Sequence, residues 1–196
     1  MRHFVLRVPL FALGIVVMNA PMVSSSALAQ ASKAEVSGGY QVLQTRERTF
    51  PAGWYVDGAA DLNAWSGVLG TSSAGVVGEI GGAYKNEREQ TQTEDVKHKR
   101  HTLMGGVRLN WRINPRVVLF HNVLIGFERA SRTGTAAVPV SLSETKFALQ
   151  PNLGVNLMVT NTVGVRAAAD FRHVFLGGDR GGVNEYRFTT GVVFVL

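Results

Sequence analysis

Five histidines and a set of regularly spaced acids and bases are the side chains best suited to chemistry in this sequence. His98 and His101 stand three positions apart, as metal ligands can, but they lie in or beside the densely charged segment 87–100. We interpret them as solvated surface histidines. Because the sequence contains no cysteine, a thiol-ligated metal site and a disulfide framework are excluded. The sequence predicts neither a metal site nor a cofactor.

Arg172-His173 comes nearest to a catalytic motif. A histidine base needs a nucleophile within hydrogen-bonding reach, but the segment 174–176 that follows is Val-Phe-Leu. His121 and His173 are interpreted as interfacial or rim residues near strand faces. The glycine-rich stretch 177–182 could suggest a phosphate loop, but no helix follows it to supply an amide dipole. We therefore expect a flexible surface loop there and no enzymatic activity.

The charged residues alternate with apolar ones, and this period of two is typical of β-strands. Between positions 103 and 112, Leu103 and Val107 fall on one face of a strand, and Arg108 and Arg112 fall on the other. Two arginines would be unusual in the packed core of a soluble sheet. They are reasonable if the apolar face points outward into lipid and the polar face points inward.

The same alternation recurs in eight segments: 35–44, 54–62, 75–85, 103–112, 117–128, 146–157, 163–172 and 185–196. Segment 117–128 fits least well, because His121 falls on its apolar face and Phe120 on its polar face. Pro151 cannot donate to a strand ladder, so we expect a bulge or bend there. The predicted fold is all-β, an eight-stranded antiparallel up-and-down transmembrane β-barrel.

The connections between these segments alternate in kind. Polar or glycine-rich loops are predicted at 45–53, 86–101, 129–144 and 173–184, and the other connections are 63–74, 113–116 and 158–162. Outer-membrane barrels place short turns on the periplasmic side and longer loops outside. The segment 87–100 is the most densely charged, and we expect it to be the main surface for an extracellular partner.

Charged residues on the inward face should form a network that fills the barrel interior. An eight-stranded barrel is just wide enough for side chains to fill it, and charges inside must pair because an isolated buried ion is costly. We therefore expect a lumen plugged by ion pairs. The predicted lumenal residues are Asp57, Asp61, Glu79, Lys85, Arg108, Arg112, Glu128, Lys146, Arg166, Asp170, Arg172, Glu185 and Arg187.

Aromatic residues gather near the ends of the predicted strands, as the two lipid–water interfaces favour. The predicted membrane girdle consists of Trp54, Tyr84, Trp111, Phe127, Phe147, Phe171, Tyr186, Phe188 and Phe194. In a soluble sandwich, aromatic residues would more often lie in the middle of strands, within the core.

The first 29 residues have the features of a secretory signal peptide. Arg2 and Arg7 precede an apolar core at 8–18, and Ala27-Leu28-Ala29 is a small-x-small cleavage pattern. The apolar core is too short for a membrane-spanning helix. We expect a signal peptide at 1–29 and a barrel domain at 30–196. The excess of basic residues is dispersed rather than gathered with aromatics, so no nucleic-acid partner is expected.

The chain resembles the eight-stranded outer-membrane β-barrels related to the OmpA transmembrane domain. The resemblance is carried by Gly53-Trp54, by the glycine-rich strand 75–82, by Gly105-Gly106-Val107-Arg108, and by the carboxy-terminal strand 186–196. It implies an outer-membrane protein with a structural or surface-interaction role. It also implies contact with outer-membrane lipid and recognition of the carboxy-terminal strand by the barrel-assembly machinery. Members of that family usually end in an aromatic residue, whereas Leu196 is the last residue here.

Two alternatives remain open. A soluble periplasmic barrel that binds an apolar ligand, as lipocalins do, would have the opposite faces inside and outside. A lipid-modifying enzyme is the other alternative, since lipid A deacylases are barrels of similar size. This chain resembles that family only in Arg172-His173 and lacks the serine that follows the histidine there. We expect a monomer without enzymatic activity.

Overall fold

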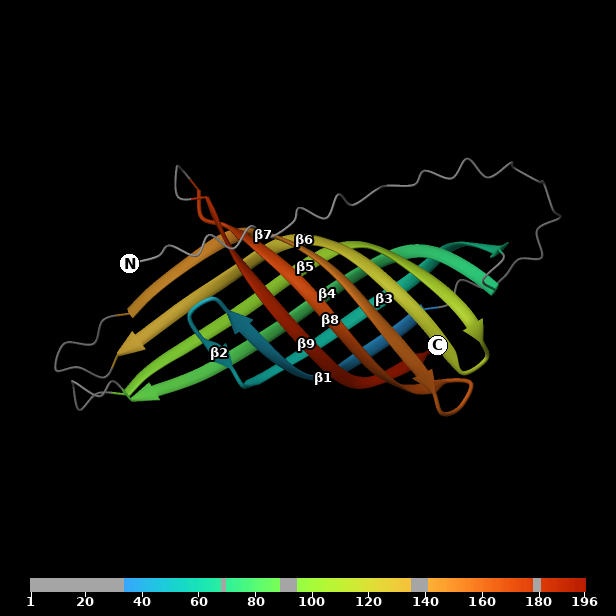
Figure 1. The fold of residues 1–196 in the computed structure, drawn as a ribbon, viewed down its shortest axis with the longest axis horizontal. Helices are drawn as coiled ribbons and strands as arrows, with labels where there is room; N and C mark the ends of the chain where they lie inside the picture. Colours follow the sequence, from blue (N-terminus) through green and yellow to red (C-terminus); the bar gives the residue numbers. More distant parts are fainter. Residues whose placement is uncertain (1–33, 68–69, 89–94, 135–140, 178–180) are drawn as a thin grey trace, which may run out of the picture. The chain divides into compact units, whose positions relative to one another are not determined.

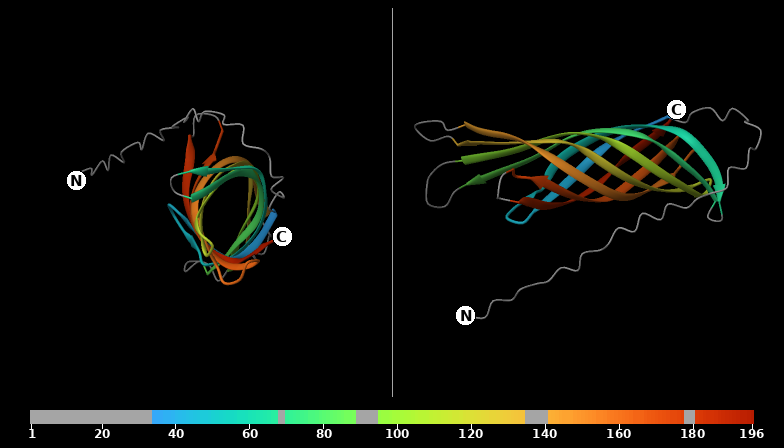
Figure 2. Two further views of the ribbon diagram at one scale, coloured as in Figure 1. Left: turned by 90° about the vertical axis from the view of Figure 1, so that its right-hand side faces the viewer. Right: turned by 90° about the horizontal axis from the view of Figure 1, so that it is seen from above.

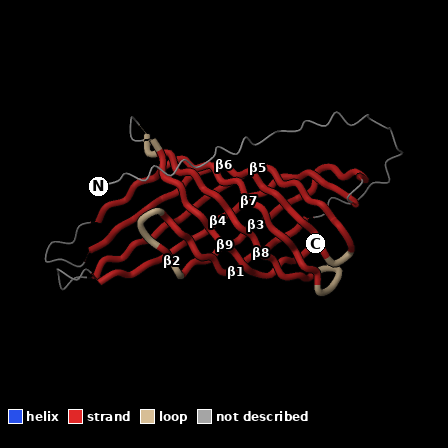
Figure 3. Tube along the Cα trace, in the orientation of Figure 1, coloured by secondary structure: helices blue, strands red, loops and turns tan. Residues whose placement is uncertain are grey.

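The computed structural model describes residues 34–67, 70–88, 95–134, 141–177 and 181–196. The predicted signal peptide at 1–29 lies outside these residues. The described chain is almost entirely β-strand (Figure 3). It contains no helix with the length and apolar character needed to cross a membrane.

The described strands form one closed antiparallel ring. They are β1 (Ala34–Thr45), β2 (Thr49–Phe50), β3 (Ala52–Gly67), β4 (Gly70–Arg88), β5 (Asp95–Asn114), β6 (Val117–Gly134), β7 (Ser141–Met158), β8 (Val163–Phe175) and β9 (Gly182–Val195). From β3 to β9 each strand pairs with the next, and β1 pairs with both β3 and β9. β2 is a two-residue strand that pairs with the end of β1. Figure 1 shows the barrel from the side, and Figure 2 shows the ring along its axis. The eight-stranded up-and-down architecture predicted from the sequence is confirmed.

The ring closes where β1 meets β9, and glycines make this seam possible. Gly39 pairs with Gly191. A Cβ added to Gly39 would lie 2.1 Å from the carbonyl oxygen of Thr190, and one added to Gly191 would lie 2.3 Å from that of Gly38. The two backbones can therefore approach this closely only because both positions lack a side chain.

The outward face of the ring is apolar, and much of the inward face is polar. Leu103 and Phe188 are 62% and 59% exposed, whereas Arg108 and Arg187 are each 1% exposed. A small apolar group also lies inside, contributed by six strands: Ala59, Val77, Met104, Leu124, Ala148 and Val174. This exposure pattern is the reverse of the one that a soluble ligand-binding barrel requires.

The strands are longer than the sequence pattern predicted. The expected loops at 86–101 and 129–144 are largely strand, since β4 continues to Arg88, β5 begins at Asp95, β6 continues to Gly134 and β7 begins at Ser141. In these extensions both faces carry polar residues, so the apolar–polar alternation disappears while the backbone ladder continues. Residues 89–94 of the charged segment 87–100 lie outside the described residues.

The prediction for Pro151 was a bulge or a bend, and the strand register shows no bulge. The β7–β8 ladder has the same register at Leu149–His173 as at Asn152–Asp170, and the two residues between them on β7 drop out of the pairing. Pro151 still pairs with Val123 on β6. The missing donor is therefore accommodated by a local gap in one ladder, without a shift of register.

The two ends of the barrel differ in their connections. One end, called the inner end here, holds the end of β3 and the start of β4, the connections at 115–116 and 159–162, the start of β1 and the end of β9. The other, the outer end, holds the connection at 46–48, the ends of β4, β6 and β8, and the starts of β5, β7 and β9. β4 to β7 have 18 to 20 residues each, whereas β1, β8 and β9 have 12 to 14. One side of the wall therefore extends further toward the outer end (Figure 1).

Candidate functional site: charges inside the barrel and a pocket at its outer end

An inner cluster of charges lies near the starts of β1 and β8. It comprises Glu35, Ser37, Asp57, Arg108, Asn122, Asn156 and Arg166. Arg166 Nη1 donates to both carboxylate oxygens of Asp57 at 2.8 Å, and Arg108 Nη2 donates to Asp57 at 3.1 Å. Both guanidiniums also pair with Glu35. Two acids and two bases from four strands therefore neutralise one another inside the ring.

Phe120 explains why segment 117–128 broke the sequence pattern. Its side chain is 1% exposed and lies inside the ring, against the inner cluster. The guanidinium carbons of Arg108 and Arg166 lie 5.0 and 4.5 Å from its ring centroid, which is cation–π geometry. Gly154 faces Phe120 on β7, and a Cβ there would lie 2.3 Å from Phe120 Cζ. The aromatic ring thus occupies the space left by a glycine.

A middle cluster is organised around Arg187 on β9. Its Nη1 and Nη2 donate to the two oxygens of Glu79 at 2.7 Å, and its Nε and Nη2 donate to Asp170 at 3.0 and 2.9 Å. Nη1 also donates to Gln41 Oε1 at 3.0 Å. All five N–H groups of the guanidinium are therefore used. Since Glu79 belongs to β4, this cluster joins strands that are separated by β1 and β3 in the barrel wall.

An outer cluster continues the network toward the outer end. Arg172 Nη1 donates to Glu128 at 2.8 Å, and its Nε donates to Gln150 Oε1 at 2.8 Å. Gln150 in turn donates to Glu79 and Asp170 of the middle cluster, at 3.3 and 3.2 Å. Arg100, which is 23% exposed at its side chain, pairs with both Glu128 and Glu185. The middle and outer clusters thus form one connected system.

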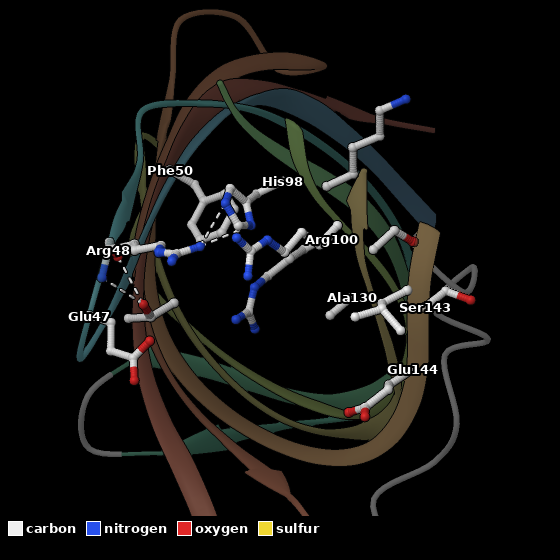
Figure 4. Close-up of a pocket in the computed structure, with 13 residues that line it drawn as sticks. Glu47, Arg48, Phe50, His98, Arg100, Ala130, Ser143 and Glu144 are labelled. Carbon is white, nitrogen blue, oxygen red and sulfur yellow. Dashed lines mark hydrogen bonds between the residues drawn. The ribbon is translucent and has the colours of Figure 1, made fainter. Parts of the chain in front are cut away.

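A pocket of about 390 Å³ opens above the outer cluster (Figure 4). Its lining includes Arg48, Phe50, His98, Arg100, Leu142 and Glu144. Arg100 lies over the ring of Phe50, with 5.3 Å from its guanidinium carbon to the ring centroid. In Figure 4 Arg48, Phe50 and His98 gather on one side of the pocket, while Ser143 and Glu144 lie across from them. Arg100 therefore belongs both to the pocket and to the charge network beneath it.

The rim of this pocket holds a small group of partly exposed ion pairs. Glu87 pairs with Lys85, and its carboxylate lies 3.5 Å from both Arg48 Nε and His98 Nε2. The hydrogen bond from Lys85 lowers the pKa of Glu87, and the nearby Arg48 adds to that effect. Burial lowers the pKa of His98, and the Arg48 guanidinium lowers it further. Arg48 Nη1 lies 2.7 Å from His98 Nε2, a contact that suits a neutral imidazole.

The thirteen residues predicted to lie in the lumen are found in different parts of the barrel. Nine of them belong to the ionic part of the three clusters, together with Glu35 and Arg100: Asp57, Glu79, Arg108, Glu128, Arg166, Asp170, Arg172, Glu185 and Arg187. Lys85 and Lys146 lie at the outer rim, where they pair with Glu87 and Glu144. Asp61 accepts a hydrogen bond from Asn110, and Arg112 lies half-buried near the inner end.

Several members of the clusters were not predicted from the sequence. Glu35 has the inward parity of Ser37 and Gln41 on β1, so the alternation could have revealed it. Arg100 has the parity of Arg108 but was assigned to a loop, and only the observed extension of β5 places it inside. The alternation placed Phe120 on the inward face, but its pairing with Gly154 is visible only in the strand register.

The histidine pair at 98 and 101 is not brought together. His98 is buried on the inward face of β5, whereas His101 is exposed and contacts Tyr84. Within the described residues, no group of three or more histidine, aspartate or glutamate side chains is arranged to hold a metal ion. His173 Nδ1 lies 2.6 Å from Asn184 Oδ1, and Val174 and Phe175 follow it on β8.

Most of the predicted girdle residues are exposed on the outward face. Trp54, Phe127, Phe147, Phe171, Tyr186, Phe188 and Phe194 are all exposed, and Tyr84 and Trp111 are half-buried. Neighbouring strands bring several rings into contact: Phe127 and Phe147 have centroids 6.1 Å apart, and Phe171 and Tyr186 have centroids 5.7 Å apart. Trp54 Nε1 donates to the Tyr84 hydroxyl at 3.0 Å.

Comparison with known proteins identifies the fold. No protein-family model and no curated protein sequence matches the chain. Among solved structures it is similar to Ail of Yersinia pestis in complex with the heparin analogue sucrose octasulfate, with 18% identity, a TM-score of 0.55, and coverage of 83% of this chain and 99% of that chain. It is also similar to Neisserial surface protein A, with 12% identity, a TM-score of 0.56, and coverage of 83% and 96%. A major outer-membrane protein of Thermus thermophilus has 10% identity, a TM-score of 0.60, and coverage of 85% and 100%.

These similarities and the ring topology agree. The chain has the fold of the eight-stranded outer-membrane β-barrels. Its outward apolar face is the surface that such a barrel presents to lipid.

Proposed function

We propose that this protein is an integral β-barrel of a bacterial outer membrane, exported by its signal peptide, with a structural or surface-interaction role. The observation that carries this proposal is the inverted burial: arginines are buried inside the ring while leucines and phenylalanines are exposed outside it. A band of exposed apolar side chains around a closed ring is stable in lipid and unfavourable in water.

The barrel is proposed to be closed to solutes by its own side chains. Five arginines and six carboxylates belong to the three clusters, and Arg187 and Gln150 connect strands across the interior. Eight strands leave an interior that side chains can fill. Reconstitution into planar bilayers should give no steady conductance of porin size, and such a conductance would overturn this part of the proposal.

Membrane integration has its own test. The folded barrel should fractionate with outer membranes and migrate differently on gels before and after heating. Recovery of the mature chain as a soluble, detergent-free protein would contradict it and favour the lipocalin-like alternative.

Orientation can be tested with single cysteines because the natural chain has none. Glu47→Cys lies in the outer connection at 46–48, and Arg116→Cys lies in the turn at 115–116. On intact cells, a membrane-impermeant maleimide should label the first variant and spare the second. Labelling of Arg116→Cys alone would reverse the proposed orientation.

The segment 87–100 is proposed as the principal contact for an extracellular partner. Its described parts belong to the long extensions of β4 and β5, which lie at the outer end and carry exposed Lys97 and Lys99. Replacing the segment with a short neutral turn should abolish any adhesion phenotype of the intact protein while leaving heat-modifiability unchanged. An unchanged phenotype would rule this segment out.

A non-enzymatic monomer is proposed, assembled by the barrel-assembly machinery through its carboxy-terminal strand. His173 supports this proposal, because it contacts an asparagine and is followed by three apolar residues. Closure of the ring supports the monomer, because each strand of the described ring already pairs with two neighbours and leaves no long edge for a second copy. Sedimentation in detergent tests the monomer, and lipase or deacylase assays with phospholipid and glycolipid substrates test the lack of catalysis.

A further inference from the structure

The outward side of the long strands carries a cationic surface at the outer end. On β5 the outward residues in this region are Lys97, Lys99 and His101, and all three are exposed. Arg129 on β6 is exposed too and pairs with His101 in the β5–β6 ladder. These four residues are called the outward basic surface.

Strand register arranges this surface in rows. One row contains Tyr84, Lys99, Ser131 and Ser143 on β4 to β7, and the row below it contains Gly82, His101, Arg129 and Thr145. Arg129 Nη2 lies 3.5 Å from Ser143 Oγ. Cations alternating with hydroxyl groups suit the oxygens of phosphate, which accept hydrogen bonds from both.

Most acids of the same region face the other way. At the described outward positions of β4 to β7 beyond Leu103 and Phe127, the one acidic residue is Asp95 at the start of β5, and it pairs with Arg88 in the β4–β5 ladder. Glu87, Glu128 and Glu144 have inward parity, and they pair with Lys85, Arg100 and Lys146 respectively. At the level of Lys99, His101 and Arg129, the outward rows of the wall therefore contain cations and no carboxylate.

The height of the outward basic surface above the exposed apolar band determines which layer of the membrane it reaches. Leu103 and Phe127 are 62% and 55% exposed and lie two residues from His101 and Arg129 on their strands. Two residues advance about 6.8 Å along a strand, or roughly 5 Å along the barrel axis for a strand tilted by about 40°. The headgroup layer on each side of a bilayer is about 5–7 Å thick. His101 and Arg129 thus reach the headgroups, and Lys99 reaches their outer edge.

The opposite side of the barrel lacks this surface. At the same end, the outward positions of β8 and β9 hold Phe171, His173, Asn184 and Tyr186, and none of these is a lysine or arginine. Because this cationic surface lies on one side of the barrel only, it indicates a particular binding site, which the general positive charge of the protein would not. Its continuity with the exposed apolar band favours a ligand that has both an anionic head and acyl chains.

We propose that the outward basic surface of β5 and β6 binds the phosphate groups of a phosphorylated lipid in the outer leaflet. This inference rests on the proposed membrane location. Arg129 and Lys99 supply the charge, Ser131 and Ser143 supply hydroxyl donors, and the acyl chains lie along Leu103 and Phe127. The ligand class is an anionic lipid headgroup, with the lipid held beside the barrel wall rather than in the pocket.

The test uses the folded, full-length mature barrel in zwitterionic detergent. Binding of a diphosphorylated lipid A is compared with binding of the same lipid after removal of its phosphates, by native mass spectrometry and by the shift in the heat-modification midpoint. The variant Lys99→Gln/Arg129→Gln should bind the phosphorylated lipid roughly tenfold or more weakly, since juxtamembrane basic residues each attract anionic lipid substantially. The matched control Arg46→Gln/Arg116→Gln removes two exposed cations elsewhere and should bind as the natural chain does.

Heat-modifiability without lipid is measured on every sample, so a variant that fails to fold is recognised separately from one that folds without binding. Loss of folding in all samples would count against the membrane barrel itself. Equal binding of the phosphorylated and dephosphorylated lipids would overturn the phosphate site, as would equal weakening in both double variants. If inorganic phosphate or a dissolved sulfated polysaccharide competes as effectively as the lipid, the assignment to a lipid ligand fails.

Discussion

Arg187 in the middle of the barrel and Lys146 at its outer rim each pair with carboxylates, yet they are held very differently. Arg187 is 1% exposed and uses all five of its N–H groups on three neighbours. Lys146 is 25% exposed at its side chain and pairs with Glu144, which is 63% exposed. Water can replace the partner of Lys146, but nothing in the interior can replace Glu79 or Asp170.

The contrast shows why counting ion pairs would misjudge this barrel. A buried ion pair contributes little net stability compared with an apolar pair of equal volume. Removing one partner, however, leaves the other buried without a counter-charge. The clusters therefore act less as a source of stability than as a constraint, because each member is required once the others are present. At the rim the same residue types carry no such requirement.

The largest expected effect is that of Arg187→Ala, which would leave Glu79 and Asp170 buried without their cation. Breaking a buried pair in this way costs about 3–5 kcal/mol. Urea unfolding in lipid vesicles should show this loss. Adding Glu79→Gln and Asp170→Asn should restore part of the lost stability. The usual value for an exposed pair is below about 1 kcal/mol. A loss of that size for the single variant would show that Arg187 is held no more tightly than the residues of the rim.

Arg100→Gln tests the boundary between the two regions. Arg100 is partly exposed at the pocket but pairs with the buried Glu128 and Glu185. We expect a loss of about 2–3 kcal/mol, since hydrogen bonds to charged groups contribute about 1.5–3 kcal/mol. The same unfolding measurement applies, and an effect as small as that of a rim substitution would assign Arg100 to the rim.

The variant Phe120→Leu tests whether the inner cluster depends on its aromatic residue. Losing the ring removes two cation–π contacts and some volume, at a cost of about 1–2 kcal/mol. The adjacent His121→Leu is the control, because His121 lies on the outward face and should tolerate an apolar substitution. Equal urea midpoints for the two variants would show that the stacking contributes nothing.

Lys146→Gln should change the free energy of unfolding by less than about 1 kcal/mol, the usual value for an exposed pair. The effect should shrink further when salt is raised, because exposed charges are screened. Urea midpoints at low and high ionic strength provide the check. A loss near that of Arg187→Ala would mean that the rim is as constrained as the interior.

The smallest effect concerns the titration of His98. Its pKa should lie below the usual value of about 6.5 for histidine, because of burial and Arg48. Since the unfolded chain takes up this proton more readily, His98 should disfavour the folded state as the pH falls below about 6.5. Arg48→Gln should raise the pKa of His98, as measured by NMR, and a lowered value would contradict the assigned cause.

The alternation of the sequence was enough to predict the ring and much of the interior. Asp57, Arg108 and Arg166 were assigned to the inward face from parity alone, and the structure places them together. Parity cannot say which inward residues meet, because tilt and stagger of the strands bring Glu79 of β4 to Arg187 of β9. Those pairings can be identified only from the folded structure.

The outer end was harder to predict for a physical reason. Beyond the lipid, both faces of a strand meet water, so polar residues stand on both faces and the period of two is lost. The extensions of β5 to β7, and with them Arg100, were therefore assigned to loops. Phe120 was misleading for a different reason: an aromatic residue inside a polar interior makes sense only once its two arginines and Gly154 are seen around it.

The glycine seam between β1 and β9 has a consequence for how the molecule forms. It joins the first and last of the described strands, so the contact that completes the cylinder spans almost the whole described chain. Loop-closure entropy makes such distant contacts slow to form. Until they form, two strand edges stay open to unwanted partners. Assembly is therefore expected to be a single cooperative event, in which the inward charges lose their water only as the last ladder closes.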